Sequence, residues 1–402
     1  MEGIEQLPEI LRLASGYIYP NEAELHWGFL VVIYPYLTGL VAGAFILASL
    51  VKVFNVKALL PTYRLSMLTA LSFLIVAPLP LLAHLGHPER SLQIFLTPQP
   101  KSAMAMFGFV YAWYLMMVLL AEIWLEYRIV LIEKGRTKKG LKKLFYKFVS
   151  LWDTDTSKKS IIFDHKAIHF ITLVGIPSAF LLHGYVGFIF GAIKANPWWS
   201  SVLMPVVFLF SAIVSGIALV LILYTLTSLF KSRPIDMKCL EKLAAFLLYA
   251  LLVDFSLEML DFIHRLYESE ESIEILGHMI TNRLFISLII VQMLLGTIIP
   301  LITLSILHIK KDMPVEFRRL GYLIAAVLIQ MGIFSTRWNV VVGGQLFSKS
   351  LRGLTIYKVE MLGTEGLFMG ILLLVLPLII LYFVAKILPM WQDDPVVDSG
   401  TK

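Results

Sequence analysis

Four ionisable residues follow one another at helical spacing in an otherwise apolar stretch, LLVDFSLEMLDFIHRLYE at 251–268. Asp254, Glu258, Asp261 and Arg265 occupy positions i, i+4, i+7 and i+11, which form one stripe of an α-helix. Carboxylates in such a stripe can take up and release protons, and an arginine beside them can balance their charge. Each charged group would cost roughly 2.5–3.5 kcal/mol at the centre of a bilayer, so the stripe must face protein or a water-filled cavity.

Two plainer interpretations of this stretch stay open. Asp261 and Arg265, four residues apart, could form only a helical salt bridge at the membrane rim. His264 could simply extend to the lipid headgroups. Asp254 and Glu258 lie deeper, where a purely structural role would need a specific buried partner.

The composition indicates that these residues belong to a membrane protein. Of the 402 residues, 58% are hydrophobic and only 15% are charged, which is too apolar for a soluble domain. Cys239 is the only cysteine, so an internal disulfide and a cysteine-held iron–sulfur cluster are excluded. We predict an all-α integral membrane protein whose surroundings are the lipid bilayer, with no second soluble domain and no nucleic-acid partner.

Runs of about twenty apolar residues, the length that crosses roughly 30 Å of hydrocarbon, occur nine times. The predicted spans are residues 28–53, 64–84, 103–129, 167–191, 201–230, 240–265, 283–308, 317–341 and 364–388.

The longest connection between spans, residues 130–166, has apolar residues at helical spacing against a lysine face. These residues are Leu141, Leu144, Phe145, Phe148 and Trp152. The pattern predicts an amphipathic helix on the membrane surface, although a solvated basic loop is the alternative.

The distribution of Lys and Arg predicts the orientation. If the N-terminus is outside, the inner segments carry 24 of the 34 Lys and Arg residues, in agreement with the positive-inside rule. Residues 1–27 are then an extracytoplasmic segment, and they lack the basic start and cleavage site of a signal peptide. We therefore expect nine helices, N-out and C-in, in the cytoplasmic (inner) membrane.

Part of the chain resembles another part. LTGLVAGAFIL at 37–47 aligns with FSAIVSGIALV at 210–220, so that Gly43 falls on Gly216. Small residues four apart allow helices to approach closely in lipid. A true repeat would make 28–191 and 201–341 two parallel four-helix bundles, with 364–388 as a peripheral helix. Two unrelated packing faces would align equally well.

Ionisable and aromatic residues are also expected near the outer ends of other spans. Asp254 lies about 22 Å from the inner end of its span at 1.5 Å per residue, which places the stripe in the outer half. Its candidate partners are His26, Trp27, His84, His87, His183, Arg337, Trp338 and Glu365.

Four stretches together resemble the NrfD/PsrC family, the membrane subunits of polysulfide reductase and related quinone-linked complexes. They are HLGHPERSLQIFLTPQPKSAM (84–104), LLHGYVGFIFGAIKANPWWSS (181–201), DFIHR (261–265) and TRWNVVVGGQ (336–345). The length and the number of spans are most similar to the long branch, which includes HybB-type hydrogenase anchors and membrane subunits of alternative complex III and of DsrMKJOP complexes. No extra hydrophobic span precedes residue 28, unlike in ten-span relatives.

The resemblance implies a subunit without heme or iron–sulfur cluster that binds menaquinol or another quinol near the outer face. Its electrons would pass to a ferredoxin-like four-cluster iron–sulfur subunit docked there. A complex of the DsrMKJOP type would add heme-containing and heterodisulfide-reductase-like subunits and would serve sulfur- or sulfate-linked anaerobic respiration. On the matching motifs, the family's site residues fall on His183, Asp261, Arg265 and Arg337.

Quinol oxidation releases two protons, so it needs a base within hydrogen-bond reach, about 2.6–3.2 Å, and a relay to water. We expect proton handling by His183, Asp254, Glu258 and Asp261. The residues expected to bind the quinone are His26, His84, His183, Arg265, Arg337 and Trp338. The quinone and the partner's clusters would carry the electrons.

Three other classes of function fit the sequence less well. A transporter would more often show inverted repeats and broken helices at the bilayer midplane. A heme b anchor would need facing histidine pairs, and His84 with His183 is the one plausible outer pair. An inert anchor for a peripheral enzyme would leave the deep carboxylates unexplained.

Overall fold

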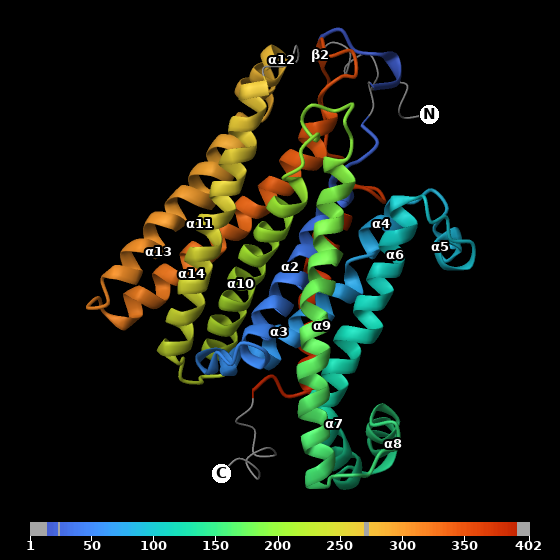
Figure 1. The fold of residues 1–402 in the computed structure, drawn as a ribbon, viewed down its shortest axis with the longest axis vertical. Coiled ribbons are helices and arrows are strands. Elements are labelled where there is room, and N and C mark those ends of the chain that lie inside the picture. The colour runs from blue at the N-terminus through green and yellow to red at the C-terminus, as the bar shows by residue number, and fades with distance from the viewer. Residues whose placement is uncertain (1–13, 23–24, 269–272, 392–402) are drawn as a thin grey trace.

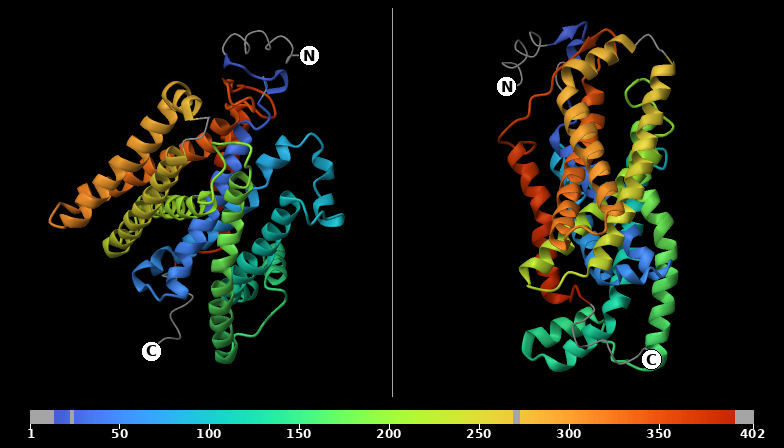
Figure 2. Two further views of the ribbon diagram at one scale, coloured as in Figure 1. Left: turned by 45° about the horizontal axis from the view of Figure 1, so that its top comes forward. Right: turned by 90° about the vertical axis from the view of Figure 1, so that its left-hand side faces the viewer.

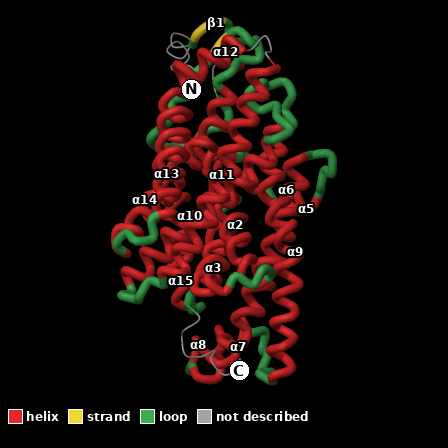
Figure 3. Tube along the Cα trace, turned by 60° about the vertical axis from the view of Figure 1, so that its left-hand side comes forward, coloured by secondary structure: helices red, strands yellow, loops and turns green. Residues whose placement is uncertain are grey.

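The computed structural model describes residues 14–22, 25–268 and 273–391. Most of the described chain is helical, as Figure 3 shows, and this confirms an all-α integral membrane protein. Within these residues eight helices are long and apolar enough to cross a membrane. They are Phe29–Lys52, Lys57–His84, Lys158–Gly191, Met204–Phe230, Met237–Arg265, Phe285–Ile309, Val315–Gly343 and Leu367–Ile387. Each corresponds to one of the predicted spans.

The first group of helices contains α2 (Phe29–Lys52), α3 (Leu60–Val76), α6 (Ala103–Trp113), α7 (Ala121–Thr137) and α9 (Lys158–Gly191). The predicted span at 103–129 is the run formed by α6, the π-helical η4 (Tyr114–Leu120) and α7. The short elements of this half are η2 (Lys57–Leu59), α4 (Leu79–His84), η3 (Pro88–Arg90) and α5 (Gln93–Leu96).

The second group contains α10 (Met204–Phe230), α11 (Met237–Glu268), α13 (Ile299–Ile309) and α14 (Val315–Trp338). Its π-helical segments are η5 (Met279–Arg283), η6 (Phe285–Ile298) and η7 (Asn339–Gly343), and α12 (Ile273–His278) precedes η5. The last helix, α15 (Leu367–Ile387), packs mainly against α3 and α2.

The two groups meet along α2 and α10, which pack together and run in the same direction, away from the end that carries β2 (Figures 1 and 2). A Cβ atom on Gly43 would lie 2.0 Å from the carbonyl oxygen of Ala212. A Cβ atom on Gly216 would lie 2.3 Å from the carbonyl carbon of Gly43. The small residues that the sequence aligned therefore pack directly against each other, at a distance that only glycine permits.

The end of the molecule predicted to be outside carries two short strands. β1 (Ser15–Gly16) pairs antiparallel with β2 (Gly353–Leu354), so the N-terminal segment lies against the loop before α15. Glu22, at the end of η1 (Pro20–Glu22), accepts hydrogen bonds from Ser348 Oγ at 2.5 Å and from the backbone N–H of Lys349. This pairing was not predicted. Much of the expected extracytoplasmic segment, residues 1–13 and 23–24, lies outside the described residues.

A helix, α8 (Gly140–Val149), is present where the surface helix was predicted. Leu141, Leu144, Phe145 and Phe148 of α8 are exposed, and so is Trp152 just after it.

The connection between α7 and α9 is shorter than predicted because both helices extend beyond the predicted spans. Arg128 of α7 joins them by bonds to Asp164 of α9 at 2.7 and 2.8 Å, and to Asp153 in the connection at 2.5 Å.

Candidate functional site

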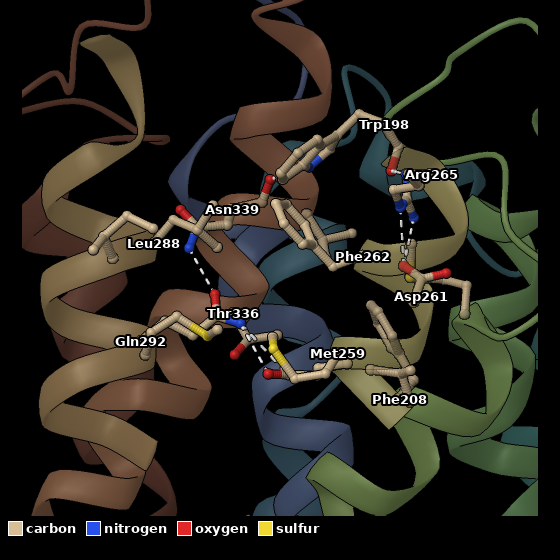
Figure 4. Close-up of a pocket in the computed structure, with 16 residues that line it drawn as sticks. Trp198, Phe208, Met259, Asp261, Phe262, Arg265, Leu288, Gln292, Thr336 and Asn339 are labelled. Atoms are coloured by element: carbon tan, nitrogen blue, oxygen red, sulfur yellow. Dashed lines mark hydrogen bonds and ion pairs between the residues drawn. The ribbon is translucent and has the colours of Figure 1, made fainter. Parts of the chain in front are cut away.

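Three of the four stripe residues on α11 line one cavity near the predicted outer end (Figure 4). The cavity has a volume of about 190 Å³ and lies between α10, α11, η6 and the junction of α14 with η7. Glu258, Asp261 and Arg265 are on its wall, whereas Asp254 is buried and does not line it. Most of the remaining wall is apolar or aromatic, with Phe208, Met259 and Phe262 among its residues.

Neutral amides form the wall opposite Asp261 and Arg265, as Figure 4 shows for Gln292 and Asn339. Gln292 Nε2 lies 3.3 Å from both carboxylate oxygens of Glu258. The carbonyl oxygen of the Gln292 side chain accepts from Asn339 Nδ2 at 2.8 Å, and Asn339 Oδ1 accepts from Ser287 Oγ at 2.6 Å. Glu258 is thus the end of a polar chain that crosses from α11 to η6 and η7.

Sequence reasoning did not identify Gln292 and Asn339. A signal was available, because both are polar residues inside otherwise apolar spans, and Asn339 lies within the TRWNVVVGGQ motif. Both also lie on π-helical segments, which are frequent at functional sites because they redirect side chains from the regular helical face.

The outer rim of the cavity is held by the Asp261–Arg265 ion pair, with a nitrogen–oxygen distance of 2.8 Å. The helical salt bridge that the spacing allowed is therefore present, but it does more than join two turns of α11. Arg265 Nη1 also donates to the backbone carbonyls of Pro197 and Trp198, and the hydroxyl of Ser201 donates to Asp261. The pair thereby fixes the connection between α9 and α10 over the cavity.

Trp198 contacts both Asn339 and Arg265 at the outer rim of the cavity. Its indole lines the cavity and donates from Nε1 to the backbone carbonyl of Asn339 at 2.8 Å. The guanidinium of Arg265 lies 5.7 Å from the centre of the same ring. The motifs at 181–201, 261–265 and 336–345 therefore meet at one place.

His183 and Arg337 form a separate, fully buried pair behind Phe208. Arg337 Nη2 lies 3.2 Å from His183 Nε2 and 2.5 Å from Ser211 Oγ. The Arg337 guanidinium stacks 4.1 Å from the centre of the Phe208 ring, whose side chain also lines the cavity. His183 itself does not reach the cavity, so it does not directly meet a molecule held there.

The hydrogen bonds of His183 define which of its nitrogens carries a proton. Arginine can only donate, so Nε2 accepts from Arg337, and a neutral imidazole then carries its hydrogen on Nδ1. Nδ1 lies 3.3 Å from Thr38 Oγ1, which is itself 3.1 Å from the backbone carbonyl of Tyr34. The lone pair that could accept a quinol proton is therefore occupied by Arg337.

Asp254 lies one turn below Glu258, towards the predicted inner side. Among the described residues, Asp254 Oδ1 and two nitrogens of Arg337, Nε and Nη1, are buried without a hydrogen-bond partner. Arg337 is close enough to both carboxyls to interact with them electrostatically. Arg337 therefore connects the stripe on α11 with the His183 network, and it does so by charge rather than by a direct hydrogen bond.

The other predicted binding residues lie elsewhere. His26 lines a second cavity of about 350 Å³ beside the N-terminal segment. His84 Nδ1 lies 2.9 Å from Glu365 Oε1, so His84 and His183 have different partners. Trp338 faces an apolar cavity of about 650 Å³ on the other side of α14. In the part of the chain that the structure describes, no group of three or more His, Cys, Asp or Glu residues could hold a metal ion.

The cavity can therefore hold a flat apolar ring and exchange protons with it. Aromatic and methionine side chains provide the apolar contacts, while Glu258, Asp261 and Arg265 provide charged groups at membrane depth. Ligand pockets commonly measure roughly 300–1,000 Å³, so this one is suited to a ring rather than to a ring together with a long tail.

Comparison with known proteins agrees with this picture. The family model described as polysulphide reductase, NrfD, matches residues 20–349. A selenate reductase subunit from Mesobacillus selenatarsenatis is 32% identical over 323 residues, which are 79% of this chain and 73% of that protein. The integral membrane subunit of an Hdr-like menaquinol oxidoreductase from Archaeoglobus fulgidus is 24% identical over 346 residues, 85% of this chain and 76% of that protein. Protein NrfD of Escherichia coli is 29% identical over 206 residues, 49% of this chain and 59% of that protein.

The family model covers most of the chain, and a relative above 30% identity spans nearly four-fifths of it. Two of these relatives are named as subunits of a reductase and of an oxidoreductase, which agrees with a multi-pass membrane subunit of a redox complex. The chain belongs to the polysulphide reductase NrfD family.

Proposed function

We propose that the cavity beside Asp261 and Arg265 binds the ring of a menaquinol and that the chain passes its electrons to an iron–sulfur subunit docked on the outer side. The observation that carries this proposal is Glu258, a carboxylate at membrane depth on the wall of a largely apolar cavity. The name of the Archaeoglobus relative, a menaquinol oxidoreductase subunit, supports the choice of quinol.

Glu258 is the group best placed to accept the first proton. It faces the cavity, and the Gln292 amide at 3.3 Å holds its carboxylate in position. Asp261 lies almost one turn further towards the outer rim, in an ion pair with Arg265, and is proposed to receive the second proton. Oxidation of a quinol to a quinone releases two electrons and two protons, so one route for protons and one for electrons must leave the cavity.

Arg337, Asp254 and His183 are proposed to act from behind the cavity wall. The charge of Arg337 stabilises a negatively charged Glu258, and its bonds to Ser211 and His183 fix the guanidinium in place. His183 is then a positioning residue that acts through Arg337. Asp254 is proposed to pass protons along the stripe, because it is buried and one of its oxygens has no partner among the described residues.

The electron acceptor would dock where the outer loops gather. Lys349, whose side chain is 77% exposed, and the nearby Arg352 offer positive charge for an acidic partner surface. The acidic segment ESEESIE at 268–274 would add the opposite sign, but residues 269–272 lie outside the described residues. A four-cluster iron–sulfur partner and a place in sulfur-linked respiration are proposed on the family resemblance alone.

The test measures menaquinol oxidation per assembled complex in variants that retain shape. Glu258→Gln and Asp254→Asn should each slow turnover by about 100-fold, the usual size of losing one positioned acid–base group. His183→Ala should also slow turnover, because Arg337 Nη2 loses its ring acceptor. Glu316→Gln, at the exposed inner start of α14, is the matched control and should turn over normally.

If the stripe on α11 has only a structural role, the same variants should behave differently. In that case the amide variants would assemble less or melt earlier, while the complex that did assemble would oxidise menaquinol at the normal rate. Normal turnover per assembled complex in all three variants refutes the proposal.

A further inference from the structure

The first group of helices contains a buried carboxyl that the proposed function does not use. Glu122 of α7 is completely buried, with hydrogen-bond partners on α3 and α9. Tyr63 Oη of α3 lies 3.1 Å from its Oε1 atom, and Thr172 Oγ1 of α9 lies 2.9 Å from the same atom. Oε2 is buried and has no hydrogen-bond partner among the described residues.

The neighbours of Glu122 place it in the inner half of the membrane. Glu126, one helical turn further along α7, bonds to Lys52 at 2.9 Å and to Arg64 at 3.0 Å. Lys52 is the last residue of α2 and Arg64 lies in the first turns of α3, so both mark the predicted inner end. The cavity lined by Glu258 lies at the other end, between helices of the second group.

The number of hydrogens around Glu122 indicates a bound proton. Thr172 Oγ1 lies 2.9 Å from Glu122 Oε1 and 2.8 Å from the backbone carbonyl oxygen of Ile168. The Thr172 hydroxyl has one hydrogen, so it either shares this hydrogen between the two oxygens or donates to one of them alone. If Thr172 donates to Ile168 alone, as a threonine often does to the carbonyl four residues earlier, the hydrogen in the contact with Oε1 belongs to the Glu122 carboxyl.

The charges one helical turn away from Glu122 favour its ionised form. Lys52 and Arg64 carry two positive charges and bond to one carboxylate, Glu126. The remaining positive charge and a hydroxyl that donates to Glu122 would favour its ionised form, while burial of the carboxyl favours the protonated form. A carboxyl subject to both influences is suited to bind and to release a proton.

The groups around this carboxyl come from α2, α3, η4, α7 and α9 of the first group. The titratable or charged ones are Lys52 of α2, Tyr63 and Arg64 of α3, Tyr114 of η4, Glu126 of α7 and His169 of α9. Tyr114 Oη, eight residues before Glu122, is also buried without a partner among the described residues. Lys52 retains 18% exposure of its side chain, so the cluster reaches the inner surface.

We propose that Glu122 is a proton-binding site in the inner half of the first helix group, which exchanges its proton with the inner aqueous side past Glu126 and Lys52. The proton lies on Oε1 and is donated to Thr172, whose hydroxyl donates to Ile168. The site is separate from the carboxylates of the outer cavity and does not depend on the proposed quinol chemistry.

The test is infrared spectroscopy of the full chain in lipid nanodiscs, in H₂O and in D₂O, without quinone. The wild-type spectrum should contain a C=O stretching band of a protonated carboxyl that moves to lower frequency in D₂O. Glu122→Gln should lose this band. Glu133→Gln, on the same helix three turns further in, is the matched control and should keep it.

A second variant tests the assigned hydrogen bond in case Glu122→Gln does not fold. Thr172→Val removes the acceptor of the carboxyl proton, so the band should remain and move to higher frequency. Wild-type and Glu122→Gln spectra with identical carboxyl bands would overturn the proposal, and so would a Thr172→Val band at the wild-type frequency. Because no quinone is present, either result would leave the quinol proposal unaffected.

Discussion

Replacing Gly216 by alanine should separate the two helix groups. The added Cβ would lie 2.3 Å from the carbonyl carbon of Gly43 and 2.4 Å from the amide nitrogen of Ala44. Both are backbone atoms of α2, so no side chain can rotate away. Since carbon atoms pack at roughly 3.5–4.0 Å, α2 and α10 would have to move apart by more than about 1 Å. Overpacking of this kind costs about 1–3 kcal/mol.

The control is another helical glycine with room for a methyl group. A Cβ on Gly184 of α9 would meet only the carbonyl oxygen of Pro205, at 3.9 Å. Alanine is favoured over glycine in a helix interior by about 0.5–1 kcal/mol, so Gly184→Ala should keep or raise the melting temperature. Gly216→Ala should lower the melting temperature, so the two substitutions should change it in opposite directions.

The assay is thermal unfolding of the purified chain in one detergent, at one protein concentration and one heating rate, because membrane proteins often unfold irreversibly. Gly43→Ala, which would place its Cβ 2.0 Å from the Ala212 carbonyl oxygen, should behave like Gly216→Ala. Equal melting temperatures for Gly216→Ala and Gly184→Ala would show that α2 and α10 do not pack as closely as described.

Three further predictions concern cofactors, topology and acid sensitivity. The purified chain should show no heme band in a reduced-minus-oxidised spectrum and no bound iron, and a b-type band from this chain alone would contradict the reasoning. Lys349→Cys should react with an impermeant maleimide only from the outside of intact cells. The hydrogen bond from the Asp155 N–H, helped by Arg128, lowers the pKa of Asp153, so its stabilisation is lost as the pH falls through that lowered value. Acid should therefore expose the loop at 150–158 to protease, and Asp153→Asn should weaken this pH dependence.

The spans could be predicted closely from the sequence because the bilayer sets one length for every apolar run. Eight predicted spans match described helices, and the small residues aligned between 37–47 and 210–220 indeed pack closely. The sequence could not indicate that α7 and α9 extend beyond these runs. Arg128 links the two extended helices and their connection by its bonds to Asp164 and Asp153, two contacts between residues distant in the sequence.

The residues of the site were harder to predict than the spans. A charged residue in an apolar span is easy to identify in the sequence, whereas a neutral polar residue there is not. The stripe on α11 is conspicuous, and three of its members reach the cavity. Gln292 and Asn339 complete the polar wall without carrying charge, and their positions depend on π-helical turns that periodicity does not reveal. His26, His84 and Trp338 share the predicted depth but not the cavity, because depth along the membrane says nothing about which side of a helix a residue faces.

The close contact between the two helix groups and the chemistry of the cavity depend on the same surface. Gly39 of α2 lies in the small-residue stretch, and a Cβ there would be 3.2 Å from the His183 ring. Small residues therefore bring α2 and α10 together and also leave the space in which His183 meets Arg337. Arg337 in turn stacks on Phe208, the ring that separates it from the cavity. A change of about 1 Å between the groups would thus reach the cavity wall through Phe208, so packing between the two halves determines the geometry of the proposed quinol site.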